Sequence, residues 1–222
     1  MKMEMQEQTV ALSKEQIRAL PAFQNLHPEN ILVIRTLEQC REIQDELNQV
    51  KILGFDTESK PTFKVGEKST GPHLIQLASH DKAYLFQVST EILGFLKPIL
   101  ENERQLKVGF GLKNDTSGFR RQGIEPKSLI ELSKSFSSFG YTSQVGVQTA
   151  VALLFQRYFT KSKKISTSNW AVKNLSSKQI AYAAADAYAA LLIFGHLYTQ
   201  QLLTPQLQQQ ISRILDDSVS RT

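Results

Sequence analysis

Apolar and polar residues follow two patterns along the first half of the chain, and these patterns predict alternating strands and helices. Short apolar runs between polar or glycine-rich segments indicate strands, whereas apolar positions three and four residues apart indicate helices. We expect strands at 31–35, 52–58, 74–79, 83–88 and 107–110, and helices at 37–50, 93–100 and 112–122. This order predicts an α/β domain, with a mixed, twisted sheet flanked by helices.

The second half of the chain, from Ser128 onward, has a mainly helical pattern. We expect helices at 147–159 and 177–198, and a terminal amphipathic helix at 200–210. The helix at 177–198 has a well-marked start, because Ser176 and Gln179 form a capping-box pair. Alanine is frequent between 181 and 190, which allows this helix to approach a sheet closely.

The N-terminal segment has a capping-box pair of its own, Ser13 and Gln16, which predicts a short helix that ends near Pro21. We expect residues 1–28 to form a peripheral extension and residues 29–222 to form a single domain. A chain of 222 residues is long enough to bury one full core.

Two carboxylates at the end of the strand at 52–58 are the strongest chemical signal. Side chains two residues apart in a strand project to the same side, so Asp56 and Glu58 can converge on one point. A divalent cation would satisfy both. Two acids spaced in this way, without other supporting residues, more often mark only the point where a strand enters a polar loop. The metal-site interpretation therefore needs further residues.

Two later segments supply them. Asp115 follows the short buried strand at 107–110, and Tyr182 and Asp186 share one face of the long alanine-rich helix. An aspartate lowers the helix propensity of such a helix, which indicates that it serves another purpose. Tyr182 on its own would be interpreted as a core aromatic residue, but its spacing to Asp186 favours a role in the same site.

The ordered residues Asp56, Glu58, Asp115, Tyr182 and Asp186 resemble the DEDDy branch of the DnaQ-like 3′–5′ exonucleases. The three motifs are residues 54–58 (GFDTE), 111–115 (GLKND) and 182–186 (YAAAD), supported by 74–78 (LIQLA) and 168–170 (SNW). The pattern is similar to the exonuclease domain of the Werner syndrome protein and to ribonuclease D. The resemblance implies a ribonuclease-H-like fold.

The resemblance also implies a role for each motif residue, with two divalent cations, Mg²⁺ or Mn²⁺, as cofactors. Asp56 would bridge both ions, Glu58 and Asp186 would hold the ion that activates water, and Asp115 would support the second ion. Tyr182 would orient the attacking water. Hard cations prefer oxygen ligands of this kind.

Contacts to the substrate are expected from two sources. The resemblance implies contacts at Thr57, Gln76 and Asn114. Lys161, Lys163 and Lys164 could follow the phosphates, although a run of charges is more often a solvated loop. Trp170 could stack on a base, although a single tryptophan before a core helix more often serves packing.

Composition limits the setting without fixing the function. The net charge of +5 and the pI near 9.2 agree with a polyanionic partner. The single cysteine, Cys40, excludes an internal disulfide and fits a reducing cytosol.

Residues 1–8 lack the apolar segment of a secretory signal. Residues 180–198 are apolar enough for a membrane helix, but Asp186 would cost about 2.5 to 3.5 kcal/mol there, so we expect a buried core helix.

We therefore expect an enzyme, a cytoplasmic 3′–5′ exonuclease, with association with the nucleoid as an option and without secretion or contact with a membrane. Its partner would be a nucleic acid with a 3′ end, with DNA favoured and DNA repair as the setting. It would release nucleoside 5′-monophosphates. Two alternatives stay open: 3′ trimming of structured RNA, as in ribonuclease D, and a non-catalytic nucleic-acid-binding module. Four clustered acids argue against the second, because they would repel phosphates.

Overall fold

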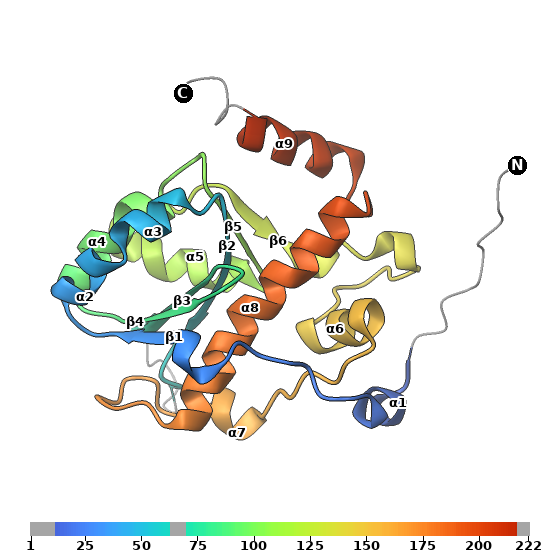
Figure 1. Cartoon of the computed structure of the whole chain (residues 1–222), viewed down its shortest axis with the longest axis horizontal. Helices are drawn as coiled ribbons and strands as arrows, with labels where there is room; N and C mark the ends of the chain where they lie inside the picture. Colours follow the sequence, from blue (N-terminus) through green and yellow to red (C-terminus); the bar gives the residue numbers. More distant parts are fainter. Residues whose placement is uncertain (1–11, 63–69, 217–222) are drawn as a thin grey trace, which may run out of the picture.

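A six-stranded mixed sheet forms the centre of the molecule (Figure 1). The computed structural model describes residues 12–62 and 70–216, and within the helix at 112–121 the side chains at 113–115 and 117 lie outside the description. The strand order is β1-β4-β3-β2-β5-β6, and β3 runs antiparallel to both of its neighbours. The strands are β1 (Ile31–Ile34), β2 (Ile52–Glu58), β3 (Leu74–Ala78), β4 (Ala83–Gln87), β5 (Leu106–Gly109) and β6 (Leu129–Glu131).

Helices cover both faces of the sheet. The α-helices are α1 (Lys14–Ala19), α2 (Leu37–Glu42), α3 (Gln44–Gln49), α4 (Thr90–Leu100), α5 (Leu112–Arg121), α6 (Val147–Phe155), α7 (Lys163–Ser166), α8 (Ser177–Thr199) and α9 (Pro205–Asp216). Short 3₁₀ turns lie at η1 (Pro28–Asn30), η2 (Leu132–Lys134) and η3 (Ser137–Phe139). Figure 1 shows α8 crossing one face of the sheet, with α2 to α5 grouped on the other.

Alternation along the strands assigns side chains to two cores. Leu53 and Phe55 of β2 are buried in the core with α2, α3, α4 and α5. The intervening position, Gly54, faces α8: a Cβ atom there would lie 2.8 Å from the carbonyl carbon of Ala187 and 3.1 Å from Cβ of Leu191. The absence of a side chain at Gly54 therefore lets α8 lie directly against β2.

The predicted ribonuclease-H-like arrangement of sheet and helices is confirmed, as is the buried position of α8. This helix is long and apolar enough, by length and composition alone, to pass a test for membrane spans. It contacts β2, β3, β4 and β5, and most of its apolar residues are buried against them. The capping box of Ser176 and Gln179 is present, as is that of Ser13 and Gln16 on α1.

Four expectations about elements were wrong. The terminal helix expected at 200–210 is α9 at Pro205–Asp216, because Gln200 caps the end of α8 and the next helix begins at Pro205. The segment from Ser128 onward begins with a strand, β6, rather than with helix. The helix expected at 37–50 is divided at Ile43 into α2 and α3. The helix expected at 147–159 ends at Phe155, because Gln156 adopts a left-handed conformation with φ of 52°.

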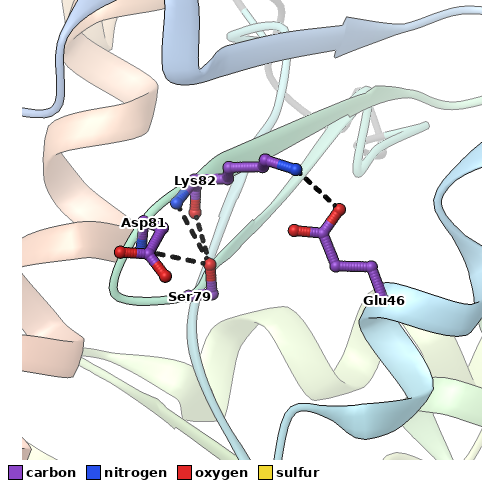
Figure 2. A network of polar contacts seen from close by, with 4 residues as sticks. All are labelled: Glu46, Ser79, Asp81 and Lys82. Carbon is purple, nitrogen blue, oxygen red and sulfur yellow. Dashed lines mark hydrogen bonds and ion pairs between the residues drawn. The ribbon is translucent and has the colours of Figure 1, made fainter.

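A polar network fixes the turn between β3 and β4 (Figure 2). Oγ of Ser79 accepts from the backbone N–H of Lys82 at 3.1 Å, and Nζ of Lys82 donates to Glu46 of α3 at 2.8 Å. Because Ala78 pairs with Gly54 rather than with Glu58, this turn lies at the end of the sheet opposite Asp56 and Glu58. The network therefore stabilises the end of the sheet that is distant from the carboxylates.

Lys107 of β5 is a fully buried lysine. Its Nζ donates to the backbone carbonyls of Asn102, at 2.7 Å, and Ile99, at 3.2 Å. The ammonium thus caps the C-terminal end of α4, where cations are favoured. Burial lowers the pKa of Lys107 to about 7.

The stretch that follows α1 is attached to the domain. α1 itself buries no residue. Beyond it, the backbone N–H of Phe23 donates to the carbonyl of Tyr158 at 2.9 Å, and the Asn25 amide donates to the carbonyl of Ala181 in α8 at 2.9 Å. Part of the N-terminal segment therefore lies beside the helix that carries Tyr182.

Candidate active site

The end of β2 and the middle of α8 bring three carboxylates together. Asp56 and Glu58 lie on the face of β2 that also includes Gly54, and α8 covers this face. One carboxylate oxygen from each of Asp56, Glu58 and Asp186 lies within 4.8 Å of the other two. The cluster thus joins the acids of the first and third motifs, as their pattern predicted.

The fourth predicted ligand, Asp115, lies in α5. The backbone of α5 begins right after β5, the strand parallel to β2, so the helix starts at the same edge of the sheet as the carboxylates. The side chains of Asp115 and Asn114 are outside the part of the chain that the structure describes. Their predicted roles therefore stay predictions.

Asp186 has the most unusual environment of the three. Its side chain is 3% exposed, and its Oδ1 lies 3.4 Å from Nζ of Lys161. Its Oδ2 is buried and has no hydrogen-bond partner among the described residues. Burial raises the pKa of Asp186, and the nearby ammonium of Lys161 opposes that rise.

The cluster has the properties of a site for a hard divalent cation. Like charges this close repel one another, and a buried carboxylate oxygen without a partner is costly. Mg²⁺ and Mn²⁺ bind carboxylate oxygens, and a cation at this point would supply the missing partner of Asp186 Oδ2. The donor set therefore fits such an ion.

Tyr182 lies one helical turn before Asp186 and is 6% exposed. Its ring centroid is 6.1 Å from that of Trp170 and 5.9 Å from Nζ of Lys161. Burial, and then the negative charges of Asp186, Glu58 and Asp56, raise the pKa of Tyr182 far above its usual value. The hydroxyl is thus protonated at neutral pH, which favours orientation of a water molecule over proton abstraction.

Two residues that were expected to contact substrate are interior residues. Trp170 is fully buried, and its indole N–H donates to the carbonyl of Ser166 at 3.2 Å. In this position it supports Tyr182 and cannot stack on a base. Gln76 is also fully buried, pairs with Asp56 across β2 and β3, and has no partner for either amide atom within the described residues.

The remaining expected contacts lie at the surface of the site. Thr57 is half-buried, and its backbone N–H donates to Oδ1 of Asp56 at 2.9 Å. Lys163 and Lys164 are exposed on α7. Lys161 just precedes α7 and turns inward to Asp186, so the three lysines do not act as one charged run.

Glu131, at the end of β6, was not predicted to support the site. Its two carboxylate oxygens accept from the backbone N–H groups of Gly111 at 3.1 Å, Leu112 at 2.8 Å and Ser133 at 2.9 Å. Gly111 and Leu112 begin α5, so Glu131 caps the helix that carries Asp115. The available signal was an acid just after a short apolar run, but that run was not recognised as a strand.

A hollow of about 270 Å³ opens beside Tyr182. It lies between α7, the first turns of α8 and the N-terminal segment, and its walls include Phe23, Phe159 and Lys178. The rings of Phe23 and Phe159 are 5.4 Å apart. The N-terminal segment thus forms part of the surface next to the carboxylates.

Comparison with known proteins gives the same assignment for fold and family. The model of a 3′–5′ exonuclease family matches residues 31–201. The mouse bifunctional 3′–5′ exonuclease/ATP-dependent helicase WRN is 30% identical over 160 residues, which cover 70% of this chain and 11% of the mouse protein. The chain spans 11% to 52% of the lengths of the first curated relatives it matches.

Solved structures show the same fold at lower identity. The Nibbler EXO domain of Aedes aegypti has a TM-score of 0.70 at 21% identity, with 86% of this chain and 98% of that chain covered. The Trypanosoma brucei RNase D complex with RNA U12 has a TM-score of 0.69 at 17% identity, with coverage of 90% and 72%.

Proposed function

Since the chain belongs to the 3′–5′ exonuclease family, we propose that it shortens a nucleic acid strand from its 3′ end by two-metal hydrolysis, releasing nucleoside 5′-monophosphates. The observation that carries the proposal is the convergence of Asp56, Glu58 and Asp186 within 4.8 Å. A non-catalytic binding module gains nothing from three such acids beside a phosphate backbone.

Asp56, Glu58 and Asp186 would hold the cations, with Asp115 as the further ligand that the family pattern supplies. When bound, two divalent cations activate water and neutralise the charge that develops on the phosphate and the leaving oxygen. The close packing of α8 on β2 and the capped start of α5 would keep these ligands in register.

Tyr182 would act through its hydroxyl. The ring packs beside the buried Trp170, and the hydroxyl keeps its proton because of burial and the surrounding negative charge. It would hold the attacking water in line with the phosphate, and an acid–base or orienting group of this kind contributes about a hundredfold or more to rate.

Phosphate contacts are proposed for Lys163 and Lys164 on the exposed side of α7, with Lys161 closer to the carboxylates. Changing Lys163 and Lys164 to alanine should weaken binding of all sequences alike. The negative slope of log affinity against log salt should become shallower by about 0.7 for each phosphate of a single strand that the variant no longer neutralises. An unchanged slope would show that neither lysine contacts a phosphate.

The proposal also concerns whether the substrate strand is DNA or RNA. We favour DNA, in a cytoplasmic repair setting. A ribonuclease D-like reaction on RNA is the second candidate, and the likeness to an RNase D in complex with RNA supports it. Recognition of the 2′-hydroxyl distinguishes the two substrates.

One experiment tests these points together. Matched 5′-labelled DNA and RNA strands, single-stranded, recessed and blunt, are incubated with Mg²⁺ or Mn²⁺. We expect stepwise shortening from the 3′ end, its loss on chelation, and its loss in Asp56→Asn. Asp45→Asn, an exposed acid on α3, is the matched control and should keep full activity. Internal first cuts, or full activity in excess chelator, would refute the proposal.

A further inference from the structure

Lys161 differs from the neighbouring lysines because its charge is directed into the carboxylate cluster. Its Nζ lies 3.4 Å from Oδ1 of Asp186 and 5.9 Å from the centre of the Tyr182 ring. Lys163 and Lys164 are exposed on α7, and no ion pair of either lysine is found in the described part of the chain. The inward contact of Lys161 is therefore specific to one position in this segment.

The two partners of this ion pair have very different surroundings. The side chain of Asp186 is 3% exposed, whereas that of Lys161 is 40% exposed. A buried carboxylate needs a counter-charge, and Asp186 receives one from Lys161. Lys161, by contrast, has a flexible stem and can return its ammonium to water at little cost. When this ion pair breaks, the Lys161 side chain is therefore the partner that moves, while Asp186 stays in place.

The same carboxylate also belongs to the cluster with Asp56 and Glu58. An ammonium at Oδ1 and a divalent cation at Oδ2 of the same carboxylate repel each other, so each weakens the binding of the other. We infer that Lys161 is the resident counter-ion of Asp186, which lowers metal affinity and moves toward solvent when a divalent cation binds. This inference rests on the proposed function, because it assigns Asp186 as a metal ligand.

Calorimetric titration with Mn²⁺ tests the inference without reference to activity. Lys161→Met keeps most of the side-chain length and removes the charge. We expect it to bind Mn²⁺ about fivefold more tightly than wild type, the effect of losing a partly exposed ion pair. Lys164→Met, in the exposed part of the same segment, should leave the affinity unchanged. Lys161→Arg keeps the charge and should stay within about twofold of wild type.

Thermal unfolding gives a second readout. Without metal, Lys161→Met leaves the Asp186 carboxylate buried without its counter-charge, so its Tm should fall below that of wild type. Added Mn²⁺ should then raise the Tm of Lys161→Met by more than it raises that of wild type.

The outcomes separate this inference from the proposed function. Unchanged or weaker Mn²⁺ binding by a folded Lys161→Met protein would overturn the role of Lys161 and leave the exonuclease proposal intact. A wild-type protein that takes up no Mn²⁺ at all would overturn the metal site itself, and the inference with it.

Discussion

Gly54 sets the distance between the two halves of the carboxylate cluster, so Gly54→Ala should damage the site without touching a carboxylate. A Cβ atom at this position would lie 2.8 Å from the carbonyl carbon of Ala187, and the carbonyl oxygen is closer still. Ordinary contact begins at 3.4 Å, so relieving the carbonyl carbon alone would require α8 to move by about 0.6 Å, and relieving the closer oxygen would require more than about 1 Å. Overpacking of this kind costs about 1 to 3 kcal/mol.

The same movement would carry Asp186 away from Asp56 and Glu58. Mg²⁺ requires oxygen ligands at about 2.0 to 2.1 Å in nearly ideal geometry, so a shift of this size exceeds what the site can absorb. We expect Gly54→Ala to reduce Mn²⁺ affinity by roughly ten- to a hundredfold, the range for changes that misplace ligands. Calorimetry measures the affinity, and urea unfolding measures the stability.

Gly195→Ala is the matched control, because Gly195 lies in the same helix and a Cβ atom there meets nothing within 4 Å among the described residues. It should raise the free energy of unfolding by about 0.4 to 1 kcal/mol and leave metal binding unchanged. If Gly54→Ala kept both wild-type stability and wild-type Mn²⁺ affinity, the close approach of α8 to β2 would have no role in assembling the site.

Three further predictions concern Tyr182, Glu131 and Lys107. Tyr182→Phe should lower kcat by on the order of a hundredfold at saturating Mg²⁺ while metal affinity stays nearly normal, and a near wild-type kcat would contradict the orienting role. Glu131→Ala should lower the free energy of unfolding by about 2 to 3 kcal/mol, because three backbone N–H groups lose a charged acceptor, whereas Glu131→Gln should lose less; equal stability of all three proteins in urea would count against the cap. Lys107 has a folded-state pKa of about 7, below its value in the unfolded chain, so the unfolded chain binds the extra proton between pH 7 and 10.5 and stability rises with pH across that window. Stability relative to Lys107→Met should therefore increase by about 3 kcal/mol from about pH 7 to pH 10, and parallel pH profiles would refute the lowered pKa.

Local signals in the sequence were sufficient for the elements that hold the site. β2 has the predicted bounds because its apolar run is long and ends in two acids. α8 was predicted within one residue at its C-terminal end, because a capping box marks its start and alanines mark the face that meets the sheet. The convergence of Asp56 with Asp186 followed from these two elements and the family pattern.

Other features depend on contacts that no local pattern encodes. β6 has three residues, too few to show a period, and its pairing with β5 makes it a strand. The inward turn of Lys161 depends on a buried carboxylate 25 positions away. Gln76 and Trp170 looked like polar and aromatic contacts for a substrate, yet the packing of α8 against β3 buries one and the packing of α7 and α8 buries the other.

Trp170 has a consequence for observing the protein at work. It is the single tryptophan of the chain, it is fully buried, and its indole N–H is bonded to the carbonyl of Ser166 at the end of α7. Indole fluorescence responds to the polarity of its surroundings, so its emission reports on the region where α7 and α8 meet the sheet. Any movement of that region when a metal ion or a nucleic acid strand binds should shift the emission wavelength. Binding can therefore be followed by intrinsic fluorescence, without a label.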